Sequence, residues 1–361
     1  MTLWRILFRI PWHILLVAAV LIVVGALALY SASEGSWQPW AGRHALRGAV
    51  GVSIVLLMAF VDFKLVYRFS YILLVAAVII LAGLLVIGSG PNVSRWITIG
   101  GVSFQPSEPT KIAIILALAR YFDNQPQDRM QSLIVHLPAL AIIAVPFLLV
   151  MNQPDLGTAL MLLLGGLSVM FAAGLPWRYV GGATVLALGA MPLLWMTLHD
   201  YQKSRVMTFL HPEADVLGAG YQIIQSKIAL GSGGLFGKGF LMGSQSQLDY
   251  LPEKQTDFVF TMIGEEFGLV GNLFILGLYL ALSLSILRIS YLVRSRFSQL
   301  TCMGISMMLF FYVFVNVAMV SGMLPVVGAP LPLISYGGTS MLTVFIGLGI
   351  VTSILIHDRQ E

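Results

Sequence analysis

Ten apolar stretches, separated by short polar segments, account for most of the chain. Each is close to the ~20 residues that a helix needs to cross the hydrocarbon core of a bilayer. The pattern predicts an all-α integral membrane protein with about ten transmembrane helices. The predicted spans cover residues 12–30, 45–61, 69–88, 107–122, 133–151, 157–174, 178–197, 258–287, 300–322 and 336–356.

One segment, residues 198–257, interrupts this pattern between the seventh and eighth spans. It holds six of the sixteen acids and is dense in glycine. Within it, residues 221–230 read as an amphipathic helix, and residues 243–249 form a polar strip. Long loops in compact proteins are usually functional or disordered, and this one is not of low complexity. We expect a large folded extracytoplasmic loop within a single polytopic domain that covers residues 1–361.

Composition supports a membrane protein and excludes several other classes. Hydrophobic residues make up 58% of the chain and charged residues only 10%, whereas soluble domains carry about 25% charged residues. A lone cysteine allows no internal disulfide, and the six histidines form no HExxH motif, so no zinc site is predicted. The bases are scattered between apolar runs, which does not indicate nucleic-acid binding.

The distribution of Lys and Arg predicts the orientation. Positive residues are enriched in cytoplasmic loops, and ten spans place both termini on one side. Three bases lie in the short loops opposite the termini: Arg43, Arg47 and Arg95. Eleven lie on the side of the termini: Arg5, Arg9, Lys64, Arg68, Arg120, Arg129, Arg178, Arg288, Arg294, Arg296 and Arg359. Both termini are therefore predicted to be cytoplasmic.

Two outer segments place an acid in a first helical turn after a proline: FQPSE at 104–108 and NQPDLGT at 152–158. Helix N-termini favour carboxylates and anionic ligands, so Asp155 is either a plain cap or part of a site. Glu108 has Lys111 at i+3 on the same helix face. Such a pair in an apolar span lines a polar cavity or forms a buried structural ion pair.

Asp257 ends the long loop, at the edge of the eighth span and beside aromatic residues. Desolvation there can raise the pKa of a carboxyl, which suits a general base. The alternative is a helix N-cap. Lys203, Arg205, Lys227 and Lys238 are candidates for an anionic substrate or, alternatively, bases that extend to the membrane interface.

Two further tracts indicate backbone structure more than chemistry. The glycines of 231–239 match neither a P-loop nor GxGxxG, so we expect turns and close packing. Prolines and glycines in 325–338 predict irregular backbone, which a membrane tolerates only where protein or a wet cavity covers it. Glu265 is expected to cap a helix or to find a partner within the bundle.

These tracts together resemble the SEDS proteins, named for shape, elongation, division and sporulation. The matching motifs are FQPSE with Lys111, NQPDLGT, GxGYQ with Gln225 and Ser226, LPExxTDF at 251–258 and PLPxxSYGG at 330–338. They cover nearly the whole chain in order. The polar strip GSQSQLD at 243–249 is similar to the RodA branch of the family rather than to the FtsW division branch.

The resemblance implies a peptidoglycan glycosyltransferase that polymerises lipid II on the outer leaflet of the bacterial inner membrane during cell elongation. Asp257 matches the family's essential acid, and Glu108 and Lys111 join it as implied catalytic residues. The implied substrate-binding residues are Ser107, Asp155, Arg205, Gln225 and Lys227. The implied partners are a class B penicillin-binding protein and other proteins of the cell-elongation complex.

This chemistry leads to the hypothesis that the glycosyl transfer inverts the anomeric centre and that Asp257 is the general base. Lys111, oriented by Glu108, and Arg205 would stabilise the leaving diphosphate, with a divalent cation, Mg²⁺ or Mn²⁺, as a further candidate. Two alternatives stay open from the sequence: a lipid II flippase and a non-catalytic scaffold. The folded loop and the missing inverted repeat favour the enzyme over the transporter.

Overall fold

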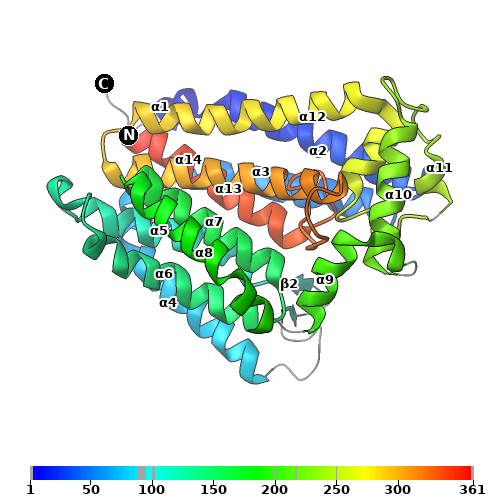
Figure 1. Ribbon diagram of the computed structural model, residues 1–361. Coiled ribbons are helices and arrows are strands. Elements are labelled where there is room, and N and C mark those ends of the chain that lie inside the picture. Colours follow the sequence, from blue (N-terminus) through cyan, green and yellow to red (C-terminus); the bar gives the residue numbers. More distant parts are fainter. Residues whose placement is uncertain are drawn as a thin grey trace.

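The computed structural model describes residues 3–87, 95–99, 102–197, 200–215, 218–248 and 250–358. Over this part of the chain it has fourteen α-helices, two short 3-10 helices and one β-hairpin (Figure 1). The elements are α1 (Leu3–Arg9), α2 (Trp12–Ala32), α3 (Ala41–Met58), α4 (Phe63–Ile87), β1 (Ile97–Ile99), β2 (Val102–Phe104), α5 (Ser107–Asp123), η1 (Gln127–Arg129), α6 (Leu133–Asn152), α7 (Leu156–Ala172), α8 (Trp177–Thr197), α9 (Asp200–Leu210), η2 (Pro212–Ala214), α10 (Ala219–Ser232), α11 (Ser244–Gln247), α12 (Val259–Leu292), α13 (Arg296–Val320) and α14 (Gly338–His357).

Each predicted apolar stretch coincides with a helix. Among the described residues, the regular structure is helical apart from the hairpin β1–β2, which pairs antiparallel. Seven of the described helices are long and apolar enough to cross a membrane: α2, α3, α4, α6, α12, α13 and α14. The apolar helix α7 is shorter. The protein is therefore a multi-pass membrane protein in its helix composition, and the total of ten spans stays a prediction.

The centre of the bundle is α5, which is buried on all its faces. Its residues 112–119 are at most 6% exposed, and it contacts α4, α6, α7, α13 and α14. A helix that is apolar all round belongs inside a bundle. Because Glu108 and Lys111 lie near the start of α5, this central position also places two charges inside the protein.

The segment between α8 and α12 is folded, as expected, although positions 198–199, 216–217 and 249 lie outside the described residues. It contains α9, α10 and α11, which gather at one end of the long helices (Figure 1). The predicted helix at 221–230 is part of α10, which packs on α12.

The glycine tract is a close-packed connection, as predicted. Gly237 has a φ of +81°, and a Cβ there would lie 2.1 Å from the carbonyl oxygen of Glu266 in α12. The next two amides, of Lys238 and Gly239, donate to the carbonyl oxygens of Glu265 and Glu266 over 3.0 Å. The tract thus joins the backbone of α12, where Gly268 has a φ of +66° and kinks the helix.

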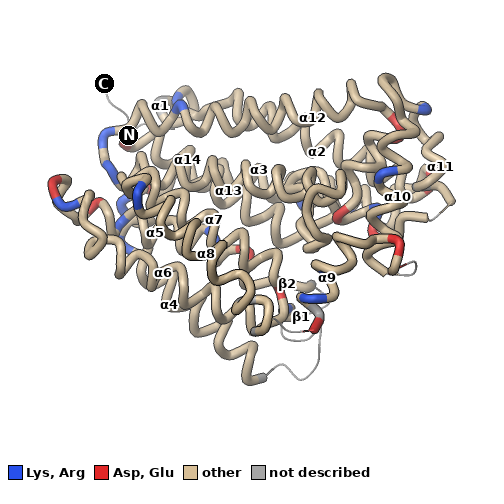
Figure 2. The backbone as a smooth tube through the Cα atoms, viewed as in Figure 1, with Lys and Arg blue, Asp and Glu red and all other residues tan. Residues whose placement is uncertain are grey.

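The two ends of the described chain meet at the opposite end of the bundle. The guanidinium of Arg9 donates to the carbonyl oxygen of Ile356 over 3.4 Å, and the amide of Arg294 donates to that of Asp358 over 3.1 Å. Figure 2 shows that Lys and Arg gather mainly at this end. The arrangement agrees with an even number of crossings.

Candidate active site

A polar cavity of about 230 Å³ lies among the starts of α5 and α14, the end of the long loop and the segment before α14. It unites the two constellations that the sequence singled out, because both Glu108 and Asp257 line its wall. The lining residues are Trp96, Gln105, Glu108, Thr256, Asp257, Gly328, Pro330, Tyr336, Gly337, Gly338, Thr339 and Ser340.

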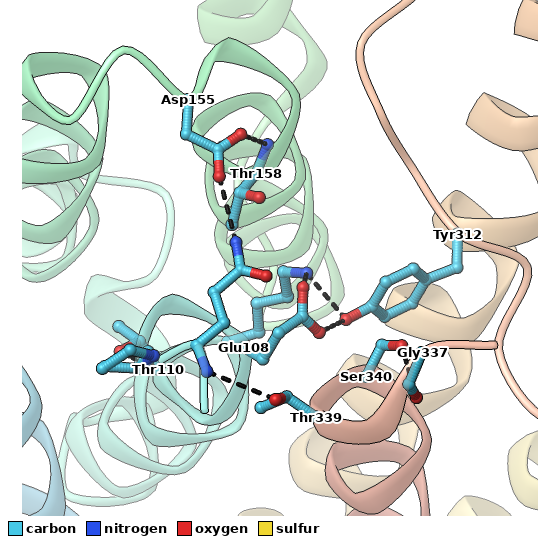
Figure 3. Close-up of polar contacts among 11 residues, drawn as sticks. Glu108, Thr110, Asp155, Thr158, Tyr312, Gly337, Thr339 and Ser340 are labelled. Atoms are coloured by element: carbon cyan, nitrogen blue, oxygen red, sulfur yellow. Dashed lines mark hydrogen bonds and ion pairs between the residues drawn. The ribbon is translucent and has the colours of Figure 1, made fainter. Parts of the chain in front are cut away.

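Behind the cavity wall, Glu108 belongs to a buried polar triad (Figure 3). Lys111 Nζ lies 2.7 Å from Glu108 Oε1 and donates to Tyr312 Oη over 2.6 Å, while the Tyr312 hydroxyl donates to Glu108 Oε2. All three side chains are at most 4% exposed. The predicted ion pair is present. Its acid, Glu108, lines the cavity, and Lys111 lies behind Glu108. Tyr312 was not predicted, because within the apolar run of α13 it looks like an ordinary core residue.

Gln105 connects three helix starts at the edge of the cavity. Its side-chain amide donates to Asp155 Oδ2 over 3.0 Å, and its backbone amide donates to the Thr339 hydroxyl over 3.2 Å (Figure 3). Asp155 also accepts from the Thr158 amide at 3.2 Å, as the N-cap of α7. Asp155 therefore caps α7 and also accepts from Gln105, which lines the cavity, while its part in a functional site stays a prediction.

Asp257 is half-buried in the cavity wall and is not a helix cap. The N-cap of α12 is Phe258, without a side-chain cap bond, so the N-cap interpretation of Asp257 is wrong. Burial, then Glu253 and Asp155, raise the pKa of Asp257 to about 7, while Arg205 opposes the rise. A carboxyl that titrates near neutrality is suited to take a proton from a hydroxyl.

The backbone around Asp257 is fastened to the irregular segment before α14. Asn316 Nδ2 donates to the carbonyl oxygens of Asp257 and Ala329 over 2.8 and 2.6 Å. Ser335 Oγ donates to the Thr256 carbonyl oxygen over 2.5 Å, and the Tyr336 amide donates to that of Gln255 over 2.8 Å. The predicted irregular backbone thus holds the carbonyl groups of residues 255–257 in place. The sequence motif contained Ser335 and Tyr336, whereas nothing in the apolar run of α13 pointed to Asn316.

The remaining predicted site residues lie outside the cavity lining. Arg205 lies in α9, and its positive charge lowers the pKa of Asp257. Its guanidinium donates to the Val326 carbonyl oxygen over 2.9 Å. Lys227 and Gln225 lie on α10, and the Lys227 side chain packs on Gly322. Ser107 is buried in the first turn of α5. Their roles in substrate binding stay predictions.

An arginine that the sequence counted only for topology also reaches this region. Arg47 lies in α3, with its guanidinium carbon 4.7 Å from the ring centroid of Tyr336, which lines the cavity. A Cβ at Gly338 would lie 3.2 Å from that guanidinium carbon. Arg47 therefore places a further positive charge, besides Lys111 and Arg205, near the polar cavity.

A separate ion pair ties the long loop to α12. Lys238 Nζ lies 2.6 Å from Glu265 Oε1, and the Ser244 hydroxyl and Gln245 amide donate to the same oxygen over 3.1 and 3.0 Å. Glu265 is fully buried, and its partner comes from the long loop rather than from another helix of the bundle, where we expected it.

Within the described ranges, no three His, Cys, Asp or Glu side chains converge as metal ligands. Both oxygens of Glu108 are already bonded, to Lys111 and to Tyr312. The cavity therefore lacks the ready donor set of a resident divalent cation.

Comparison with known proteins shows similarity over nearly the full length. The profile of the FtsW, RodA and SpoVE family, described as cell cycle protein, matches residues 6–360. The peptidoglycan glycosyltransferase MrdB of Escherichia coli K12 is 45% identical over 96% of this chain and 93% of its own. The probable peptidoglycan glycosyltransferase FtsW of Trichlorobacter lovleyi is 36% identical over 94% and 92%.

Two solved structures share the fold. One, from work on the coordination of polymerization and crosslinking by a peptidoglycan synthase complex, is 32% identical, with a TM-score of 0.82 over 98% of this chain and 99% of the other. The other, the rod shape-determining protein RodA of Thermus thermophilus, is 28% identical, with a TM-score of 0.71 over 98% of each chain.

Proposed function

The chain belongs to the FtsW, RodA and SpoVE family of cell cycle proteins, and on that premise we propose that it is a peptidoglycan glycosyltransferase. It polymerises lipid II into glycan strands during cell elongation. The names of its relatives support this activity over a lipid II flippase or a non-catalytic scaffold.

The observation that carries the proposal is the cavity that joins Asp257 and Glu108. Asp257 has a pKa of about 7 there, and Asn316 holds its backbone carbonyl. A base whose pKa lies near the working pH is ionised often enough to act and basic enough to accept a proton.

In the proposed reaction, Asp257 takes the proton of the GlcNAc 4-hydroxyl of the acceptor. The freed oxygen attacks C1 of the donor sugar, so that an O4–C1 bond forms. The bond between C1 and the phosphate oxygen breaks, and the polyprenyl diphosphate leaves with its electron pair. Attack opposite to the leaving group inverts the anomeric centre, by analogy with the geometry of inverting glycosidases.

The leaving diphosphate needs positive charge, because negative charge builds up on it in the transition state. Arg205 supplies it from α9. Lys111 is held behind Glu108 by two short contacts, so its first task is to fix that carboxylate in place. A divalent cation, Mg²⁺ or Mn²⁺, would enter with the diphosphate rather than reside in the protein.

Orientation and partner are part of the same proposal. The excess of bases at the end that holds the termini supports cytoplasmic termini and a cavity that faces the periplasm. The similarity to a synthase complex that couples polymerization and crosslinking supports a class B penicillin-binding protein as partner.

The decisive test is reconstitution of the purified protein with such a partner and fluorescent lipid II. Glycan chains that form in the presence of moenomycin support the proposal, and their absence with a correctly folded complex overturns it. A liposome assay of lipid II translocation, run on the same preparation, distinguishes a transporter from a polymerase. Translocation without polymer would establish a flippase instead.

A further inference from the structure

A second cavity lies far from the polymerisation site, at the end of the bundle where the chain ends meet. It has a volume of about 240 Å³ and is formed by the turn between α1 and α2, the last turns of α12 and the end of α14. Its lining residues are Phe8, Arg9, Ile10, Pro11, His13, Ser285, Arg288, Ile289, Leu292 and Leu355.

The cavity combines basic and apolar side chains and has no acid among its described lining residues. Arg9, His13 and Arg288 supply the bases, and Ser285 supplies a hydroxyl. Neither Arg9 nor Arg288 forms an ion pair with another of the described residues. The side of the cavity formed by Ile289, Leu292 and Leu355 is apolar.

The start of α2 adds partial positive charge to this cavity. Its N-cap, Pro11, has no side-chain cap bond, and no acid lies in the first turn. His13 is in this turn, beside the cavity. The amides of Trp12 and Ile14 already donate to the carbonyl oxygens of Ile10 and Pro11, so the start of α2 contributes the partial positive charge of a helix N-terminus rather than free donors.

Exposed aromatic residues of α1 and of the start of α2 indicate that this region lies at the surface of the membrane. Trp4, Phe8 and Trp12 are 71%, 83% and 54% exposed, and they alternate with arginines. Exposed tryptophans together with arginines are typical of the boundary between headgroups and acyl chains. Figure 2 shows this end of the bundle as the one where Lys and Arg gather.

We propose that the cavity lined by Arg9, His13 and Arg288 binds the phosphate headgroup of an anionic phospholipid, with an acyl chain along its apolar side. Charge complementarity favours this occupant, since basic pockets between helices at the cytoplasmic face suit cardiolipin and similar headgroups. A zwitterionic phospholipid adds a positive group that the two arginines would repel.

The test is native mass spectrometry of the full-length protein in detergent, titrated separately with cardiolipin, with phosphatidylglycerol and with phosphatidylcholine. We expect the anionic lipids to bind tighter than phosphatidylcholine. Each arginine is expected to contribute about five-fold in affinity. The double variant Arg9→Gln/Arg288→Gln should therefore lower the affinity for cardiolipin about 25-fold and leave the affinity for phosphatidylcholine unchanged. If the double variant cannot be purified, Arg288→Gln alone, at an exposed position, should give the five-fold loss.

Lys64→Gln is the matched control, because it removes an exposed positive charge at the same end of the bundle without touching the cavity. Equal weakening by Lys64→Gln would show general surface attraction and overturn the site. Equal binding of phosphatidylcholine, or full displacement of cardiolipin by millimolar inorganic phosphate, would overturn an anionic phospholipid as the occupant.

Discussion

The position and the pKa of Asp257 depend on the residues around it. Its backbone carbonyl is held by Asn316, and its pKa is set by burial and by the charges around it. The sequence identified Asp257, Glu108 and Lys111, because charged residues at the edge of an apolar span are conspicuous. Tyr312 and Asn316 escaped notice, because a single polar atom inside an apolar helix gives no signal until a second segment packs against it.

Asn316→Ala should lower kcat of polymerisation about ten- to hundred-fold, with a much smaller effect on lipid II binding. Loss of two hydrogen bonds frees the carbonyl of Asp257 to shift, and small misplacements of a catalytic group are costly. Steady-state kinetics with titrated lipid II separates kcat from binding. Asn272→Ala, which truncates another buried asparagine, is the control, and an equal loss of kcat there would contradict a positioning role.

The pH dependence of polymerisation should report the ionisation of Asp257. The base must be deprotonated, so the rate rises with pH and reaches half its maximum near the pKa of about 7. Arg205 lowers this pKa, so Arg205→Gln should move the midpoint to higher pH. The midpoint, not the maximal rate, is the quantity to compare. Lys203→Gln, in the same helix, should leave it in place, and an unmoved or lower midpoint in Arg205→Gln would refute the account.

At the scale of elements, the helices were predictable and their contacts were not. Apolar runs near twenty residues long define helices without knowledge of their neighbours. The hairpin of β1 and β2 escaped prediction because its strands are only three residues long and lie in the connection between two predicted spans. The glycine tract predicted close packing, but only the fold shows that its partner is the kinked start of α12.

That packing can be tested by two glycines with the same backbone requirement. Gly237 and Gly234 both have positive φ, but a Cβ at Gly237 meets α12, whereas one at Gly234 meets nothing within 4 Å. Gly234→Ala should cost only the backbone strain, about 1–2 kcal/mol. Gly237→Ala should lower the midpoint of thermal unfolding further, measured in one detergent at one heating rate. Equal unfolding midpoints of the two variants would mean that the close approach of Gly237 to α12 does not contribute to stability.

At the scale of the molecule, the bundle has a loop-rich end with the cavity nearby and a basic end that holds both ends of the described chain. The sequence predicted this polarity because topology follows the bases of short loops. It offered a polar cavity beside Glu108 only as one of two alternatives, and the structure shows which distant segments line it: the starts of α5 and α14, the end of the long loop and the segment before α14.

Orientation is testable with single cysteines, since the native Cys302 is fully buried. Ser36 lies in the exposed turn after α2, near the long loop, and Lys64 lies at the basic end. In intact spheroplasts an impermeant maleimide should label Ser36→Cys and not Lys64→Cys. Detergent should make both reactive. The reverse pattern in spheroplasts would invert the proposed topology.

The central claim is that Asp257 is the base of glycan polymerisation. Its most direct test is Asp257→Asn in the reconstituted complex with fluorescent lipid II, beside Glu213→Gln as an acid-to-amide control in the same loop. We expect Asp257→Asn to bind lipid II, to unfold at the wild-type temperature or above, and to polymerise at least about a hundred-fold more slowly. The control should polymerise normally. Glycan chains made by Asp257→Asn at the wild-type rate would contradict the mechanism.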